Sequence, residues 1–175
     1  MKKILLSAVA LMAFGAMQAQ SEEMKFGVKA GATNTTLVGD LDALDAKIGF
    51  YAGGLVDLPV SGNFHIQPEL LFSMEGAEDA GLTYLRVPIM AKYYIFEGFN
   101  IQAGPQLGIK VAAEDDFTDE LTKSVDFGLA AGVAYELPMG LFFDIRYNVG
   151  LANISDVDGG DITTAGVMLG AGWRF

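Results

Sequence analysis

The sequence predicts an all-β fold, an eight-stranded antiparallel up-and-down transmembrane β-barrel with short periplasmic turns and longer extracellular loops. Apolar and polar residues alternate with period two over stretches of about ten residues, as in a barrel wall. The connections between these stretches are alternately long and short. One face of every stretch carries no charge, although 19% of all residues are charged. Because a charge at the bilayer midplane costs about 2 to 4 kcal/mol, this face is expected to contact lipid.

The first residues form an export signal. Lys2 and Lys3 precede the apolar stretch Ile4 to Ala16, and small residues follow it. This order indicates a secretory signal peptide over residues 1–20. The apolar stretch is too short to span a bilayer, since a spanning helix needs about 20 residues. The expected mature domain therefore covers residues 21–175.

Eight alternating stretches follow the signal peptide. They run over Met24 to Thr33, Ile48 to Leu58, Phe64 to Met74, Thr83 to Ile95, Phe99 to Val111, Val125 to Glu136, Leu141 to Leu151 and Ile162 to Phe175. The tight connections are Pro59 to Asn63, Phe96 to Gly98 and Leu137 to Gly140. The other connections are long and acidic, so long loops occupy one rim and short turns the other.

The charge balance limits the classes of partner. Lys+Arg number 11 against Asp+Glu 22, and loss of the basic signal peptide makes the mature chain still more acidic. Such a chain is a poor partner for nucleic acid or anionic lipid. A mean hydropathy of +0.34 is too high for a disordered chain. The absence of cysteine excludes disulfides, thiolate metal sites, a cysteine nucleophile and a lipoprotein anchor.

The opposite face of the stretches carries the charges of both signs and many glycines. An eight-stranded barrel has little room inside, so glycine suits its interior better than its outer surface. Buried charges must be paired, and the near-equal numbers of the two signs predict a salt-bridged lumen that does not conduct solutes. The charged residues assigned to this face are Lys25, Lys29, Asp57, Glu69, Glu75, Arg86, Lys92, Lys110, Asp126, Glu136, Asp144, Arg146 and Arg174.

A soluble eight-stranded barrel of the lipocalin type is the main alternative, with an apolar inside and a polar outside. Aromatic residues argue against it, because they gather on the apolar face near the short-turn end as in an interfacial girdle. These residues are Phe26, Phe64, Tyr93, Phe99, Tyr135, Phe143 and Trp173. The final Trp173-Arg174-Phe175 is an aromatic ending of the kind that the outer-membrane barrel assembly machinery recognises, so this machinery is an expected partner during biogenesis.

Three segments carry a resemblance to a known family: Gln67 to Ser73, Tyr84 to Tyr93 and Ala103 to Gly108. They resemble the outer-membrane β-barrel domain of the PorT type, a family abundant among Bacteroidetes, and the resemblance extends over the mature chain. Arg86 departs from the acidic residue that the family pattern has there, so a lumenal ion pair of the family is expected to be reversed or absent. The resemblance implies an outer-membrane location. Some relatives serve in type IX protein secretion, which would require a periplasmic or membrane partner.

Pro68, Pro88 and Pro105 fall on three consecutive predicted strands. Proline cannot donate a ladder hydrogen bond, and a bulge is the usual accommodation. We therefore expect this sector to be the most irregular part of the wall.

The single histidine, His65, is a candidate catalytic base, with Ser61 or Ser73 as a candidate nucleophile. The alternation instead places His65 inward near a short turn, with Glu69 further along the same face. A barrel enzyme that acts on lipid would place its serine and histidine toward the membrane, and one that acts on peptides would place its histidine at the loop rim. His65 is expected at neither location. We assign no catalytic residue, and a barrel hydrolase stays an alternative that changing His65 would test.

Acidic residues of the long loops share one rim. They are Asp40, Asp42, Asp45, Glu78, Asp79, Glu114, Asp115, Asp116, Asp119, Glu120, Asp156, Asp158 and Asp161, opposed by Lys47 and Lys123. Asp156 to Asp161 contains a fragment of a calcium loop without its distal glutamate, so no metal site or cofactor is assigned. A hydrated surface that keeps the loops soluble accounts for these acids, and divalent cations could bridge it weakly to lipopolysaccharide.

These observations predict a small outer-membrane protein, not an enzyme, with a structural or interaction role in the cell envelope. Its expected surroundings are outer-membrane lipid and lipopolysaccharide. The alternative role is that of a component of protein secretion or envelope assembly.

Overall fold

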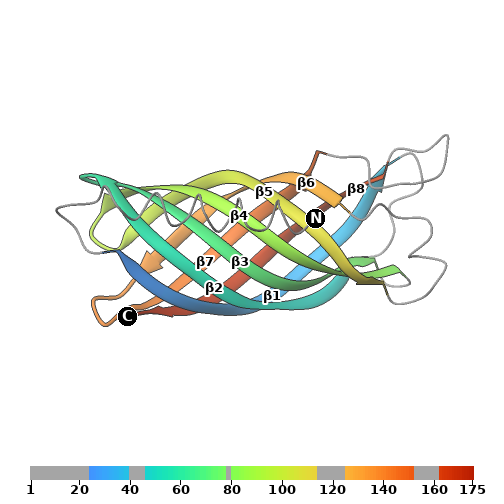
Figure 1. Ribbon diagram of the computed structural model, residues 1–175, viewed down its shortest axis with the longest axis horizontal. Coiled ribbons are helices and arrows are strands. Elements are labelled where there is room, and N and C mark those ends of the chain that lie inside the picture. Colours follow the sequence, from blue (N-terminus) through green and yellow to red (C-terminus); the bar gives the residue numbers. More distant parts are fainter. Residues whose placement is uncertain (1–23, 40–45, 78–79, 114–124, 152–161) are drawn as a thin grey trace, which may run out of the picture.

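The computed structural model describes residues 24–39, 46–77, 80–113, 125–151 and 162–175. They form a closed antiparallel barrel in which each strand pairs with its sequence neighbours and β1 pairs with β8 (Figure 1). The strands are β1 (Lys25–Gly39), β2 (Lys47–Ser61), β3 (Phe64–Ala77), β4 (Ala80–Phe96), β5 (Phe99–Ala113), β6 (Val125–Glu136), β7 (Leu141–Gly150) and β8 (Ile162–Arg174). The predicted fold class is confirmed. Among the described residues, no helix is both long enough and apolar enough to cross a membrane.

The bounds of most strands lie within a few residues of the predicted ones, and those of β6 coincide. The main difference is in β1, which continues to Gly39 instead of ending near Thr33. Its last part pairs with β8, for example Val38 with Thr163. The polar segment Asn34-Thr35-Thr36 concealed this continuation, because strand ends beyond the hydrocarbon layer need no apolar outer face.

The three short turns and the carboxyl end of β8 lie at one end of the barrel, on the left in Figure 1. Each of these turns contains a glycine with positive φ, at Gly62 (51°), Gly98 (78°) and Gly140 (93°). Only glycine adopts this conformation without strain, which explains the tight reversals. The predicted signal peptide and the acidic residues from Asp40 to Asp45, Glu78 and Asp79, Glu114 to Glu120 and Asp156 to Asp161 lie outside the described residues.

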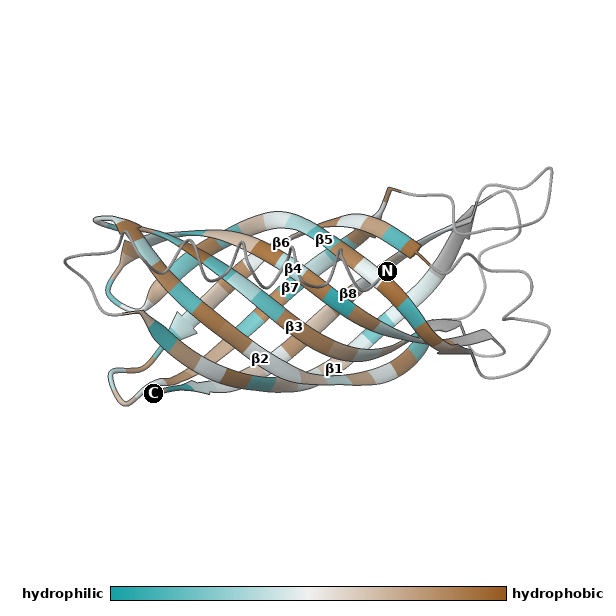
Figure 2. Ribbon diagram, viewed as in Figure 1, coloured by the Kyte–Doolittle hydropathy of each residue, from teal (hydrophilic) through white to brown (hydrophobic). Residues whose placement is uncertain are grey.

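The two faces of the wall differ as predicted. Hydropathy alternates along each strand in Figure 2. Apolar side chains point outward and are exposed, such as Phe50 (64%) and Leu169 (54%), whereas Arg86 and Lys92 are almost fully buried inside. The soluble lipocalin arrangement, with its apolar interior, is therefore wrong for this chain.

The register passes all three prolines without a shift. Partners on either side of Pro68, Pro88 and Pro105 keep the same register, so the predicted bulges at these positions were wrong. Each proline instead interrupts the ladder, because it has no N–H to donate. In each case the proline does not pair with the residue opposite it on the preceding strand.

The irregular positions lie elsewhere in the same sector. Among the described strand pairs, register shifts occur between Pro59 and Ser61 in β2–β3, and between Thr83 and Tyr84 and between Tyr94 and Phe96 in β4–β5. Irregularity is thus concentrated between β2 and β5, as expected, but toward the strand ends. There a bulge disturbs less of the ladder than it would at mid-wall.

Inward glycines make room for large side chains. A Cβ on Gly170 would lie against the hydroxyl of Tyr51 and against Asp144, and one on Gly31 would meet the Tyr51 ring. A Cβ on Gly108 would crowd the Arg86 guanidinium. The predicted placement of glycine on the inner face is confirmed, because the narrow interior holds these side chains only where the facing wall has none.

Candidate functional site in the barrel interior

Charged side chains from opposite walls meet inside the barrel. Within the described strands they form three clusters along the barrel axis, which we name the turn-end, central and far clusters according to their distance from the short turns. The charges placed inward by the alternation are buried, apart from Glu136 and Lys110, which are half-buried, and Lys25, which is exposed at the short-turn end. Buried charges are stable only when paired, so the pairing defines the site.

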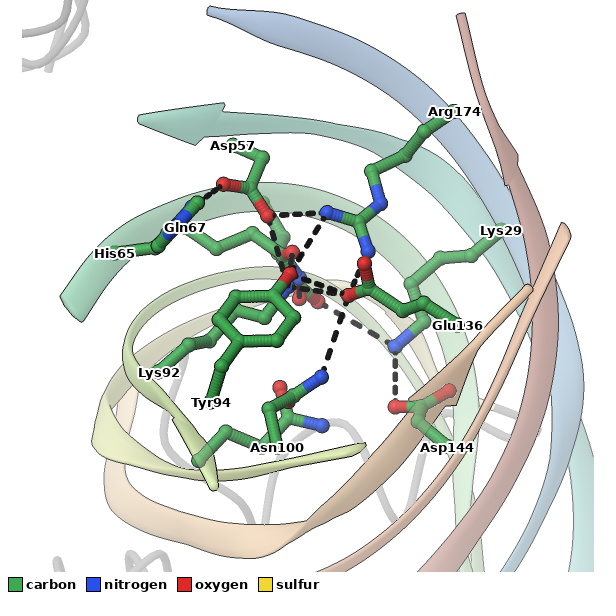
Figure 3. Close-up of polar contacts among 12 residues, drawn as sticks. Lys29, Asp57, His65, Gln67, Lys92, Tyr94, Asn100, Glu136, Asp144 and Arg174 are labelled. Carbon is green, nitrogen blue, oxygen red and sulfur yellow. Dashed lines mark hydrogen bonds and ion pairs between the residues drawn. The ribbon is translucent and has the colours of Figure 1, made fainter. Parts of the chain in front are cut away.

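The turn-end cluster joins Asp57 of β2, Lys92 of β4, Glu136 of β6 and Arg174 of β8 (Figure 3). Asp57 Oδ2 accepts from Lys92 Nζ at 2.8 Å and from Arg174 Nη1 at 2.6 Å. Glu136 Oε1 accepts from Lys92 Nζ at 2.8 Å and also pairs with Arg174. Two carboxylates and two cations thus alternate around the lumen.

Tyr94 and His65 complete this cluster. The Tyr94 hydroxyl donates to Glu136 Oε1 at 2.8 Å and accepts from Lys92 Nζ at 3.1 Å. His65 Nδ1 lies 2.5 Å from Asp57 Oδ1, and its ring meets that of Tyr94 edge-on at 4.8 Å. Figure 3 shows the contact between His65 and Asp57, which gives this carboxylate a further hydrogen-bond partner.

The central cluster joins Lys29 of β1, Glu69 of β3, and Asp144 and Arg146 of β7. Arg146 binds Glu69 through two hydrogen bonds, Nη1 to Oε2 at 2.8 Å and Nη2 to Oε1 at 2.6 Å. Lys29 Nζ donates to Asp144 Oδ2 at 2.7 Å and lies 3.7 Å from Glu69 Oε2. The bidentate pair is the strongest geometry available to arginine and a carboxylate.

The far cluster is built on Arg86 of β4. Its Nε and Nη2 donate to the two carboxylate oxygens of Glu75, each at 2.5 Å, and its Nη1 donates to Asp126 Oδ2 at 2.9 Å. The guanidinium also lies over the Tyr84 ring at 4.6 Å. An ion pair is therefore present at this position, with arginine as the cation between two acids.

Neutral side chains link the charged ones, and the sequence reasoning did not single them out. Gln67 Nε2 donates to Glu69 Oε1 at 2.6 Å, and Gln102 Oε1 accepts from Arg146 Nη2 at 3.0 Å. Tyr51 forms a small buried apolar group with Leu71 and Met168. Their inward positions follow from the same alternation that placed the charges, so the signal was present but only charge and glycine were counted.

Among the described residues, no serine is hydrogen-bonded to His65. Its ring nitrogen contacts Asp57, while Ser73 is eight residues further along β3, about 26 Å away at the rise of a strand. The Ser73 hydroxyl is buried without a hydrogen-bond partner, and Ser61 is exposed. Ser61 pairs with Phe64, the chain neighbour of His65, but makes no hydrogen bond with the His65 ring. Neither serine therefore forms a hydrogen-bonded pair with His65.

A cavity of about 520 Å³ opens at the short-turn end above the turn-end cluster. Lys25, His65, Tyr94, Glu136 and Arg174 contribute to its lining. In the part of the chain that the structure describes, no three His, Cys, Asp or Glu side chains are grouped to hold a metal ion. Polar side chains line much of this open cavity, and the ion pairs of the turn-end cluster form its inner end.

Comparisons with known proteins agree with this architecture. A family model described as outer membrane protein beta-barrel domain matches residues 18–156. The structure of Neisserial surface protein A is similar at a TM-score of 0.60 and 14% identity, covering 88% of this chain and 100% of that chain. The structure of Ail, the attachment invasion locus protein of Yersinia pestis, in complex with the heparin analogue sucrose octasulfate is similar at a TM-score of 0.58 and 18% identity. It also covers 88% of this chain and 100% of that chain. No curated protein sequence matches the chain. At these identities the structural likeness shows the fold alone.

Proposed function

Because the chain belongs to the outer membrane protein beta-barrel domain family, we propose that it has a structural or interaction role in the cell envelope, with a lumen closed to solutes. The protein resides in the outer membrane. The observation that carries the proposal is the contact between Arg146 and Glu69, whose strands β7 and β3 lie on opposite sides of the barrel. An open pore would require these two side chains to be separated.

The energetics support a closed lumen. The Arg146 and Glu69 side chains are 3% and 0% exposed, so separating them leaves two buried charges without their main partner. Breaking a buried pair in this way costs about 3 to 5 kcal/mol. An eight-stranded barrel encloses only enough space for its own side chains, so hydrated ions have no path around the three clusters.

Liposome swelling tests this proposal. Vesicles that contain the refolded protein should release or admit small sugars and amino acids no faster than empty vesicles. A channel protein in parallel vesicles shows that the assay responds. Swelling that rises in proportion to the amount of folded protein would contradict a closed lumen.

The interaction role rests on the acidic long connections. Ail was crystallised with a heparin analogue, which is a polyanion. The long connections of this chain are rich in Asp and Glu, so they would repel a polyanion and favour cationic or cation-bridged partners such as lipopolysaccharide with divalent cations. The two proteins are therefore not expected to share this ligand.

A second candidate is a PorT-like component of secretion or envelope assembly. It is favoured by the segments Gln67 to Ser73, Tyr84 to Tyr93 and Ala103 to Gly108, which lie on the neighbouring strands β3, β4 and β5. Copurification after gentle detergent extraction separates the two roles. A stable stoichiometric partner supports the secretion or assembly role, whereas its absence supports the stand-alone role.

The interior gives little support to a hydrolase. His65 contacts Asp57 and Tyr94, and no described serine is hydrogen-bonded to it. We therefore propose that His65 is structural and that the protein is not an enzyme.

A further inference from the structure

The outer face of the barrel has a hollow of about 400 Å³ over β2. At its centre is Gly54, which pairs with Val28 of β1 and Leu70 of β3. A Cβ added to Gly54 would approach only the Gly27 carbonyl oxygen, at 3.8 Å, so the space outside it is open. Apolar side chains such as Phe26, Leu70 and Phe175 surround this space. The hollow therefore lies on the face that contacts lipid.

The hollow coincides with a gap in the aromatic girdle. Near the short turns, the strands beside β2 present Phe26 on β1 and Phe64 on β3. The other described strands each present an outward aromatic residue at this level, whereas β2 presents Val56, Leu58 and Val60 there. Aromatic side chains normally fill the interface level between headgroups and hydrocarbon. At this gap an outside molecule can reach the strand itself.

Beside the hollow, one carbonyl group lacks its ladder donor. Val56 and Pro68 both line the hollow and lie opposite each other in the register of β2 and β3, but they do not pair. Pro68 has no N–H, so the Val56 carbonyl does not receive the hydrogen bond that another residue would donate. A backbone carbonyl without its ladder donor can accept a hydrogen bond from another donor that reaches it. A bound molecule that supplies a donor here is therefore stabilised.

We propose that this hollow binds one phospholipid whose headgroup carries N–H donors, such as phosphatidylethanolamine. An acyl chain lies over Gly54, and the headgroup ammonium donates to the Val56 carbonyl. The level is suitable, because Val56 pairs with Phe26 of the girdle, where headgroups are found. A partner strand is disfavoured because the sheet is closed and offers no edge, and the apolar side chains of Phe26, Leu70 and Phe175 favour an acyl chain.

Native mass spectrometry of the folded barrel can test this binding. The protein is reconstituted with equal amounts of phosphatidylethanolamine and phosphatidylcholine that have identical acyl chains. Both lipids fill the hollow, but the trimethylated headgroup has no N–H donor. The wild type should retain one phosphatidylethanolamine in preference to phosphatidylcholine by about tenfold, the worth of one charge-assisted hydrogen bond.

Two variants separate the acyl-chain contact from the headgroup contact. Gly54→Leu fills the hollow and should lose the retained lipid of either kind. Pro68→Ala supplies the missing N–H from the protein, so lipid should still be retained but without preference for ethanolamine. Ala131→Leu, a matched change on the exposed outer face of β6, should behave like the wild type. Heat-modifiable gel migration shows that each variant is folded.

Three results would overturn the proposal. The first is equal retention of the two lipids by the wild type. The second is retention by Gly54→Leu at the wild-type level. The third is a dimer in the mass spectrum that Gly54→Leu abolishes, because a second copy of the chain would then occupy the hollow in place of a lipid.

Discussion

Arg146 of β7 and Glu69 of β3 meet across the width of the barrel. Two hydrogen bonds of 2.8 Å and 2.6 Å join the guanidinium to the carboxylate, and the two strands are four apart in the closed sheet. Sheet pairing already joins neighbouring strands, but it does not join opposite walls. This contact cross-links them, so the interior charges contribute to the shape of the barrel as well as filling it.

Removing one partner of this contact should destabilise the barrel. Arg146→Ala leaves Glu69 buried with Lys29 at 3.7 Å as its remaining cation, and we expect a loss of about 3 to 5 kcal/mol in the free energy of unfolding. Urea unfolding in lipid vesicles, followed by the fluorescence of the single tryptophan, Trp173, measures it.

The double variant Arg146→Met with Glu69→Leu is the control. It removes both charges and leaves Lys29 with Asp144 at 2.7 Å, so it should be more stable than Arg146→Ala. The single variants Arg146→Met and Glu69→Leu complete a double-mutant cycle with the double variant. Losses that simply add in this cycle would mean that the two side chains do not interact.

Gly170 should not tolerate a side chain. Its Cβ would meet the Tyr51 hydroxyl and Asp144, and overpacking of this kind costs about 1 to 3 kcal/mol, so Gly170→Ala should lower the free energy of unfolding by that amount. The Tyr51 hydroxyl has no hydrogen-bond partner, so Tyr51→Phe alone should cost little and should restore part of the stability of Gly170→Ala. Gly54→Ala, which adds a Cβ into open space, is the matched control. Equal losses at Gly170 and Gly54 would contradict this explanation.

Much of the architecture could be predicted from the sequence, because a barrel wall in lipid imposes a strict alternation. The alternation placed Lys29, Glu69, Arg86 and Arg146 inward and set the bounds of β6. It could not say which charges pair, because pairing across the lumen depends on the stagger of opposite strands. Period two alone does not fix that stagger.

The prolines illustrate a second limit. Because proline has no N–H, it is expected to lose a ladder hydrogen bond. Pro68 does not pair with the residue opposite it, but the register continues on both sides without a bulge. The hollow at Gly54 was missed for a related reason. A single outward glycine gives no signal in the sequence. Gly54 forms a hollow only together with neighbours such as Val56 and Leu70, which the fold places around it.

His65 should contribute modestly to stability and nothing to catalysis. His65→Phe loses the contact with Asp57, but Asp57 keeps Lys92 and Arg174, so we expect a loss of about 0.5 to 1.5 kcal/mol in the free energy of unfolding. Arg174→Ala should cost more, because it takes a cation from two carboxylates. Unfolding in urea compares the variants. An ester or peptide hydrolysis activity that disappears in His65→Phe would contradict the structural role.

Labelling of single cysteines should give the orientation of the barrel. The chain has no cysteine, so Glu97→Cys at a short turn and Asp116→Cys in a long connection each provide one thiol. In intact cells, a membrane-impermeant maleimide should label Asp116→Cys and leave Glu97→Cys unlabelled until the cells are lysed. The reverse pattern would place the short turns outside the cell.

Planar-bilayer recording tests most directly whether the buried ion pairs close the lumen. The folded wild-type protein should give no steady conductance in molar salt. A variant with Lys29, Glu69, Asp144 and Arg146 all changed to alanine, which removes the central cluster, should show a higher ion leak than the wild type. A large, steady conductance of the wild type, unchanged by loss of these four side chains, would contradict the account.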